Sequence, residues 1–207
     1  MAFIEVPPQT DETVEAMFTT AAASHGYLPN MHKLFAHRPP VMEAWDALLS
    51  EIRANMSARR YELVTLAAAK ELKSSYCLLA HGSILLRDEM TPMELVATVE
   101  TPERAPIEDC ERAIMAFAVK VVRDANSVTR EDVEGLRHHG LTDTEIFDVT
   151  AAAAVRCFFS KTLDALGVQP DAVYRQRLGP VVRDALVLGR PIEEEEKEDA
   201  VAAVAKG

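Results

Sequence analysis

Residues 57–88 read SARRYELVTLAAAKELKSSYCLLAHGSILLRD and carry the clearest structural pattern in the chain. Ser57 is a favourable N-cap, and the helix that follows it becomes apolar on every face from Val64 to Ala69. A helix of this kind belongs in a protein core. The polar run 73–75 interrupts the pattern, and a second helix follows to about Asp88. The stretch therefore predicts a buried helical hairpin over about residues 57–89.

The rest of the chain carries the same helical signals. Thr91 with Glu94 and Thr142 with Glu145 form capping boxes, and Gly167 ends the last long helix. Alanine, the best helix former, accounts for 31 of the 207 residues, whereas glycine accounts for 8. No segment alternates with a period of two. The sequence predicts an all-α bundle of about eight or more helices, with one domain over residues 1–190 and an acidic tail over residues 191–207.

One stretch of the first hairpin is repeated later in the chain. Residues 64–69, VTLAAA, match residues 149–154, VTAAAA, at five of six positions. This match is compatible with an internal duplication of a helical unit. The second copy has Phe147 in place of Glu62 and Thr162 in place of Cys77, so only the first copy could be catalytic.

The charge of the chain excludes two classes of partner. It has 22 Lys and Arg against 33 Asp and Glu, a net charge of −11, so we expect neither nucleic-acid binding nor attraction to an anionic membrane. No apolar run is long enough to span a membrane, and the first residues do not resemble a secretory signal. The three cysteines, Cys77, Cys110 and Cys157, cannot all pair within one chain. We therefore expect reduced thiols and a cytoplasmic location.

Three residues of the hairpin form the candidate catalytic group. Cys77 and His81 are four residues apart, on one face of a helix, and Cys77 lies in its first turn, where the helix dipole favours a thiolate. Ser74 or Ser75 is available to cap that turn. Glu62 shares a face of the first helix with apolar residues, so its carboxylate is expected to point inward and meet the Cys77–His81 pair. The group could move a proton to or from a reactive thiol.

Each of these residues also has a structural interpretation. A core cysteine, a surface histidine and a solvated glutamate are common in helices, and Tyr76 could pack in the core as well as line a pocket. Cys110 and Cys157 recur with apolar residues and are predicted to be small core residues. Trp45 is predicted to anchor the core, and His138 and His139 to end a helix. His25, His32 and His37 lack acidic or cysteine partners at zinc-ligand spacing, so no metal or other cofactor is expected.

The spacing Glu62, fourteen residues, Cys77-Leu78-Leu79-Ala80-His81 resembles the signature of the alkylhydroperoxidase D-like, carboxymuconolactone decarboxylase superfamily. The resemblance is greatest to its peroxidase-related branch, and it extends to GYLPN at residues 26–30 and LDALGV at residues 163–168. It implies an all-helical fold and a homo-oligomer, commonly a trimer or hexamer. It also implies that Cys77 attacks a peroxide while Glu62 and His81 relay the proton.

The chain departs from the family at one position. The peroxidase members use a Cys-x-x-Cys pair whose first cysteine resolves the oxidised second one, and that first position is Ser74 here. The resemblance thus implies a peroxidase for hydrogen peroxide or small organic hydroperoxides that needs an external thiol reductant.

Two alternatives remain open. One is an acid–base enzyme for a small lactone or carboxylic acid, which would need Glu62 and His81 but not Cys77. The other is a non-enzymatic helical assembly with an ordinary thiol.

Overall fold

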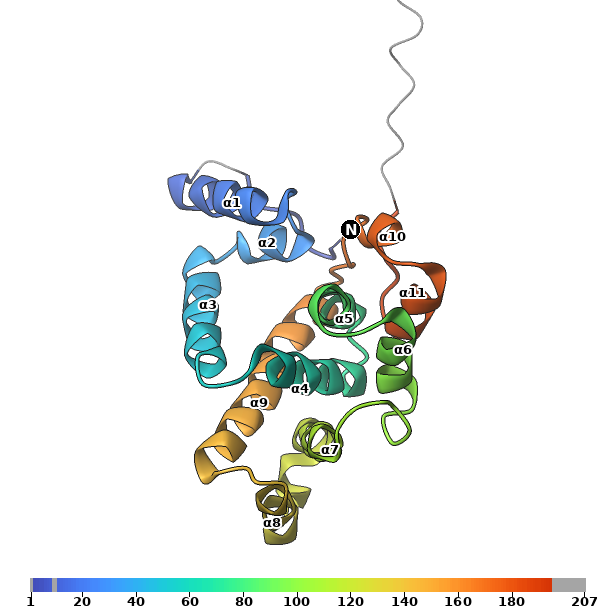
Figure 1. The fold of residues 1–207 in the computed structure, drawn as a ribbon. Coiled ribbons are helices and arrows are strands. Elements are labelled where there is room, and N and C mark those ends of the chain that lie inside the picture. The colour runs from blue at the N-terminus through green and yellow to red at the C-terminus, as the bar shows by residue number, and fades with distance from the viewer. Residues whose placement is uncertain (1, 9–10, 195–207) are drawn as a thin grey trace, which may run out of the picture.

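The computed structural model describes residues 2–8 and 11–194, and within them the fold is all-α, as predicted. These residues form eleven α-helices and one 3-10 turn, with no strand (Figure 1). The α-helices are α1 (Glu12–His25), α2 (Asn30–Phe35), α3 (Pro39–Arg53), α4 (Ala58–Glu71), α5 (Ser75–Asp88), α6 (Pro92–Glu100), α7 (Asp109–Asp124), α8 (Arg130–His138), α9 (Asp143–Ala165), α10 (Tyr174–Arg177) and α11 (Pro180–Leu186). The 3-10 turn is η1 (Ala125–Ser127). No helix in the described part of the chain is both long and apolar enough to cross a membrane.

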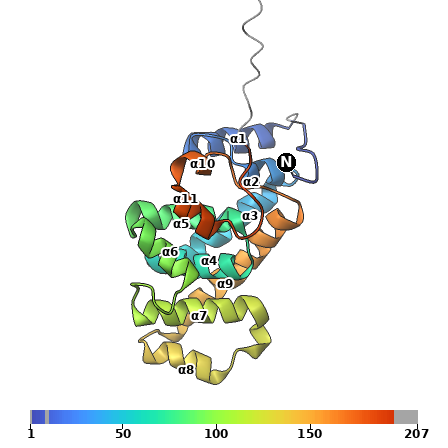
Figure 2. The same cartoon turned by 90° about the vertical axis from the view of Figure 1, so that its right-hand side faces the viewer.

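The predicted hairpin, α4 and α5, lies at the centre of the molecule. All nine residues from Tyr61 to Ala69 are buried, because α4 packs against α5, α7 and α9. Figure 1 shows α1 to α3 on one side of this centre and α6 with α11 on the other, and Figure 2 shows α7 and α8 at the opposite end from α1. The two similar segments 64–69 and 149–154 belong to α4 and α9, which pack against each other.

The turn between α4 and α5 fixes where α5, the helix of Cys77 and His81, begins. Lys73 has a positive φ of 55°, which reverses the chain. The backbone N–H of Gly189 donates to Ser75 Oγ at 2.8 Å, and a Cβ on Gly189 would lie 2.1 Å from the carbonyl oxygen of Lys73. The segment around Gly189 therefore approaches so closely that only glycine fits. Ser74 is the N-cap residue of α5 but, contrary to the expected role, its side chain makes no capping hydrogen bond.

Most other helix ends follow the predicted signals. Asp11, Ser57, Thr91 and Thr142 cap α1, α4, α6 and α9 with their side chains. Gly26, Gly140 and Gly167 have positive φ at or just beyond the ends of their helices. The short helices α10 and α11 had no counterpart in the sequence prediction.

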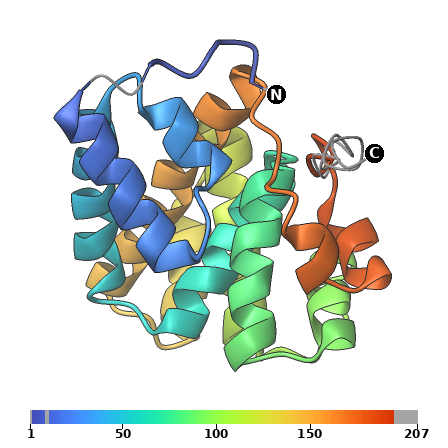
Figure 3. The same cartoon turned by 90° about the horizontal axis from the view of Figure 1, so that it is seen from above.

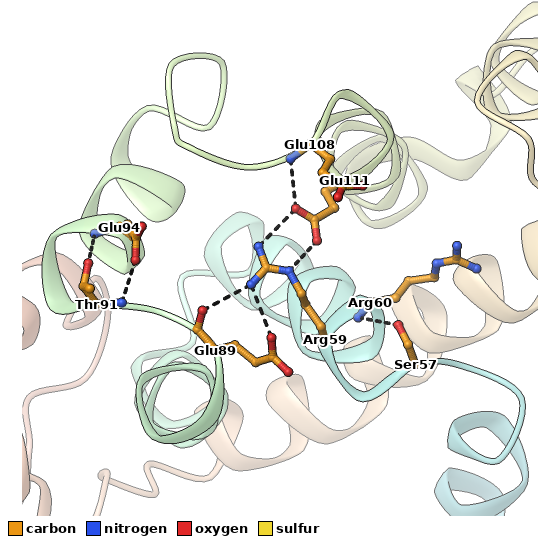
Figure 4. A network of polar contacts seen from close by, with 8 residues as sticks. All are labelled: Ser57, Arg59, Arg60, Glu89, Thr91, Glu94, Glu108 and Glu111. Carbon is orange, nitrogen blue, oxygen red and sulfur yellow. Dashed lines mark hydrogen bonds and ion pairs between the residues drawn. The ribbon is translucent and has the colours of Figure 1, made fainter.

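A partly buried ion-pair network connects α4 to the start of α7 and to the residue that follows α5 (Figure 4). Arg59 donates to both carboxylate oxygens of Glu111 at the start of α7, at 2.5 and 3.1 Å, and lies 3.7 Å from a carboxylate oxygen of Glu89, just after α5. Burial raises the pKa of Glu111, but the hydrogen bonds from Arg59 and from the N–H of Glu108 outweigh burial and lower it overall. The pair thus favours the charged form of both partners.

Helix α1 has its own small core, separate from the main one. Val14, Phe18 and Ala36 form this second cluster, with Met17 and Leu28 packed against it. Accordingly α1 packs mainly on α2 and α3, and Figure 3 shows α1 beside α2 and away from α10 and α11.

The described chain continues past residue 190, where the acidic tail was expected to begin. Ile192 is buried, and the N–H of Glu193 donates to the carbonyl oxygen of Pro170 at 2.9 Å. The Asn30 side-chain amide donates to Glu193 Oε2 at 2.8 Å. Residues 191–194 therefore contact the helical domain, and residues 195–207 of the predicted tail lie outside the described residues.

Candidate active site

The hairpin brings the three predicted residues to one place. His81 Nδ1 lies 2.5 Å from Glu62 Oε2, and Cys77 lies one helical turn before His81 on α5. Glu62 and Cys77 are only 2% and 1% exposed. Cys77 and His81 line the same cleft, and Glu62 lies behind His81. An acid, an imidazole and a thiol are therefore in the order that a proton relay requires.

The sulfur of Cys77 accepts two hydrogen bonds from α9. Ser160 Oγ donates to Cys77 Sγ at 3.1 Å, and Arg156 Nη1 donates to it at 3.7 Å. Cys77 is also the third residue of α5, so it lies in the first turn as predicted. Two hydrogen-bond donors and the N-terminal turn of α5 therefore surround the sulfur.

Arg156 is a site residue that the sequence analysis missed. It is 3% exposed, and its Nη2 donates to the hydroxyl of Tyr61 at 3.2 Å. Its guanidinium lies 5.6 Å from the ring centroids of both Trp45 and Phe159. The signal in the sequence was a single arginine within the otherwise apolar run VTAAAAVRCFF at residues 149–159.

The pKa of His81 is lowered, first by burial and then by the positive charge of Arg156, against the opposing effect of Glu62. The imidazole is therefore neutral near pH 7. An ionised Glu62 can only accept a hydrogen bond, so the proton of the ring lies on Nδ1 and Nε2 is left as the free base.

Cys77 opens into a cleft of about 600 Å³ between six helices: α1, α2, α3, α4, α5 and α9. Its walls are mostly apolar and aromatic. They include Met17, Met31, Met42, Trp45, Leu49, Tyr61, Tyr76, Ala80 and Phe159. Trp45, predicted as a core anchor, is buried and stacks on Phe159 at 4.6 Å between ring centroids, and it also forms part of this wall.

Tyr76 packs in the core and also lines the cleft, the two places that the sequence left open for it. Its hydroxyl donates to Asp171 Oδ2 at 2.7 Å and accepts from the N–H of Met31 at 3.2 Å. Burial, followed by the nearby charge of Asp171, raises the pKa of Tyr76, so its hydroxyl stays protonated. Tyr76 thus connects α5 to α2 and to the segment that follows α9.

The remaining histidines and cysteines divide between the cleft and other places. His25 and His32 line the cleft, whereas His37 contacts the carbonyl oxygen of Glu5. In the described ranges no three His, Cys, Asp or Glu side chains are grouped as metal ligands would be. Cys110 and Cys157 lie outside the cleft. They were predicted to be core residues, but both are only partly buried. His138 and His139 end α8, as predicted.

Comparison with known proteins gave matches by structure alone. No family model matches the chain, and no curated protein does so. A protein from Ralstonia eutropha JMP134, described as an alkylhydroperoxidase AhpD core and an uncharacterized peroxidase-related protein, is 25% identical with a TM-score of 0.76; the match covers 84% of this chain and 94% of that one. An uncharacterized peroxidase-related protein from Silicibacter sp. TM1040 is 22% identical, also with a TM-score of 0.76, and the match covers 84% and 93%.

A third similar structure is described as the debrominase Bmp8, a cysteine-to-alanine variant in complex with 2,3,4-tribromopyrrole. It is 18% identical with a TM-score of 0.70, and the match covers 86% of this chain and 96% of that one. In each case nearly the full length of the other protein is matched. The chain therefore has the all-α fold of the AhpD-like, peroxidase-related proteins, which confirms the superfamily that its sequence motif indicated.

Proposed function

We propose that this chain is a thiol-dependent peroxidase that reduces hydrogen peroxide or small organic hydroperoxides. The observation that carries the proposal is that Cys77 lines a cleft together with His81, which is paired with Glu62. The fold shared with peroxidase-related proteins supports it.

In the first step, the thiolate of Cys77 attacks the distal oxygen of the hydroperoxide. The S–O bond forms as the O–O bond breaks, which leaves a sulfenic acid on Cys77 and an alkoxide as the leaving group. His81 passes a proton from water to that alkoxide. Glu62 accepts the Nδ1–H of His81 and stabilises the imidazolium during the transfer.

In the second step, an external thiol reduces the sulfenic acid. Ser74 occupies the position of the family's resolving cysteine, and Cys110 and Cys157 lie outside the cleft, so Cys77 has no second cysteine of this chain beside it in the site. One small thiol condenses with the sulfenic acid to form a mixed disulfide and water. A second thiol then attacks the mixed disulfide, regenerates Cys77 and leaves as the external disulfide.

The cleft favours an organic hydroperoxide over hydrogen peroxide. Its volume of about 600 Å³ far exceeds the ~30 Å³ that one water molecule occupies, and hydrogen peroxide is a molecule of comparable scale. The apolar walls would bury an alkyl or aromatic group, which gains about 25 cal/mol for each Å² removed from water. We expect the larger substrate to show a lower KM.

The test is intact-protein mass spectrometry after brief peroxide treatment with a sulfenic-acid trap. Wild type and Cys110→Ser should each gain one trap adduct, and Cys77→Ser should gain none. Turnover of cumene hydroperoxide with dithiothreitol should likewise be lost in Cys77→Ser and reduced in Glu62→Gln. Unchanged peroxide consumption in Cys77→Ser would contradict the mechanism, and turnover of a lactone by that variant would support the acid–base alternative.

A second function is favoured by the aromatic wall beside the sulfur. Trp45 and Phe159 could hold a planar ring against Cys77, and the debrominase of similar fold binds a brominated pyrrole. In this case the thiolate would attack a bromine, so that an S–Br bond forms as the C–Br bond breaks, and the ring carbon would take a proton. One external thiol would displace bromide to give a mixed disulfide, and a second would release Cys77 and leave as the external disulfide. Bromide release from tribromopyrrole with thiol present, without turnover of hydroperoxide, would favour this second function.

We also propose that the chain assembles as a homo-oligomer, a trimer or hexamer. Large apolar side chains on its surface support this, including Phe147, Met93 and Val181, which are 68%, 65% and 57% exposed. Light scattering should give a mass of three or six chains, and a monomer at micromolar concentration would contradict the proposal.

A further inference from the structure

We propose that Cys77 rests as a thiolate and that Arg156 is its counter-ion, which makes Arg156 a catalytic residue of the site. The inference deepens the proposed peroxidase function, on which it rests for its catalytic meaning.

Arg156 is a buried cation without a carboxylate partner. It is 3% exposed, and no described carboxylate lies within ion-pair distance of its guanidinium. Its Nε has no hydrogen-bond partner, and Nη2 donates only to the neutral hydroxyl of Tyr61. An isolated charge is costly to bury, so buried arginines are normally paired with an anion. The arrangement therefore requires an anion in contact with Nη1.

The sulfur of Cys77 is the group in that position. Arg156 Nη1 donates to Sγ at 3.7 Å, and Ser160 Oγ donates to it at 3.1 Å, so the sulfur accepts two hydrogen bonds. A thiolate accepts both bonds well, whereas a thiol is a weak acceptor. A positive charge at this distance from the sulfur stabilises a thiolate relative to a thiol.

The other ionisable groups around the sulfur cannot take this role. They are His81 and Tyr76 on the same helix, Glu62 and Tyr61 on α4, Glu43, Asp46 and Arg53 on α3, His25 on α1 and His32 on α2. The carboxylate of Glu62 is bound to His81, Tyr76 stays protonated, and Glu43, Asp46, Arg53 and His25 are exposed at the cleft. Among these groups only Arg156 brings a cation into contact with Sγ.

Arg156 acts on the thiol and the imidazole in opposite senses. Its charge favours the anionic form of Cys77 and disfavours the cationic form of His81. The resting site therefore holds a thiolate beside a neutral imidazole, and the proton of the thiol has passed to water. The nucleophile is ready before a peroxide enters the cleft.

The test is the absorbance of the thiolate near 240 nm as a function of pH, taken as the difference between wild type and Cys77→Ser. We expect a midpoint below pH ~7 for wild type, against ~8.5 for an unperturbed cysteine. Arg156→Gln should raise the midpoint by about 2 pH units, and Arg156→Lys should restore part of the shift. Arg53→Gln, which removes an exposed cation of the same cleft, should leave it nearly unchanged.

Unfolding experiments test the pairing independently and do not need a fully stable Arg156→Gln. If the thiolate is the counter-ion, Arg156→Met should lower the urea midpoint of wild type and leave that of Cys77→Ser unchanged or raised. A wild-type thiolate midpoint near 8.5, or one that is low but insensitive to Arg156→Gln, would overturn the inference. So would an equal loss of stability in both backgrounds.

These outcomes separate the inference from the proposed function. The thiolate is measured without peroxide, so a low midpoint with no trapped sulfenic acid would keep the Arg156–Cys77 pair and refute the peroxidase. A trapped sulfenic acid with an ordinary midpoint would do the reverse.

Discussion

Protonation of His32 should destabilise the folded chain as the pH falls from 6.5 to 4. His32 lies in α2, is 8% exposed, and its Nδ1 has no hydrogen-bond partner. Burial, and then the charge of His25, lowers the pKa of His32 from 6.5 to about 4. The unfolded chain therefore binds this proton at a higher pH than the folded chain does. Between the two pKa values the free energy of unfolding must decrease as the pH decreases.

The size of the effect follows from the two pKa values. Each pH unit between them corresponds to about 1.4 kcal/mol, so a lowering from 6.5 to about 4 is worth about 3 kcal/mol once the pH has reached 4. Above pH 6.5 the ring is neutral in both states, and His32 then adds no pH dependence. The cost is a large part of the 5–15 kcal/mol that typically stabilises a domain.

Urea unfolding of wild type and His32→Leu at several pH values from 7 to 4 measures this directly. The free energy of unfolding should fall faster for wild type, and the difference between the two proteins should change by about 3 kcal/mol across the range. Met31→Leu, in the same helix, removes no ionisable group and should change all values equally. Parallel curves for wild type and His32→Leu would refute the argument that His32 is buried in its neutral form.

Two further predictions concern stability, and both are measured by urea unfolding with a matched control. Gly189→Ala should cost about 1–3 kcal/mol, because its Cβ would meet a backbone carbonyl at 2.1 Å. Gly135→Ala, whose Cβ meets nothing within 4 Å inside α8, should instead stabilise by about 0.5–1 kcal/mol, and equal effects would contradict the close approach. Arg59→Met should cost about 2 kcal/mol, because it breaks a two-point, partly buried ion pair. Arg137→Met, whose ion pairs are more exposed, should cost under ~1 kcal/mol, and a cost as large as that of Arg59→Met would contradict the ranking.

The helices that the sequence predicted are those with strong local patterns. The hairpin of α4 and α5 was predictable because an all-round apolar run and a polar break are visible within about thirty residues. The long helices carried caps or glycine stops. Helices α10 and α11 have four and seven residues, too short for a periodic pattern to show, and α11 forms where the chain packs back on α5 and α6.

Within the candidate site, too, the residues with a local sequence pattern could be predicted and those from a distant helix could not. Glu62, Cys77 and His81 could be predicted because one hairpin holds all three, so their spacing along the chain reflects their spacing in the fold. Arg156 and Ser160 lie 79 and 83 residues after Cys77, and only the crossing of α9 over α5 brings them to the sulfur. Of the two serines available to cap α5, Ser74 takes the N-cap position without a side-chain hydrogen bond, and Ser75 accepts a hydrogen bond from the distant Gly189, which the local sequence could not reveal.

The separate small core beneath α1 has a consequence for local unfolding of the molecule. Only Val14, Phe18 and Ala36 form the buried part of that cluster, whereas the rest of the cleft is built on the main core. A segment held by so few contacts opens at a free energy well below that of global unfolding. We therefore expect backbone amides of α1 to exchange with deuterium through an opening that leaves α4, α5 and α9 protected. Since α1 lines the cleft, each such opening widens the route by which a bulky hydroperoxide reaches Cys77.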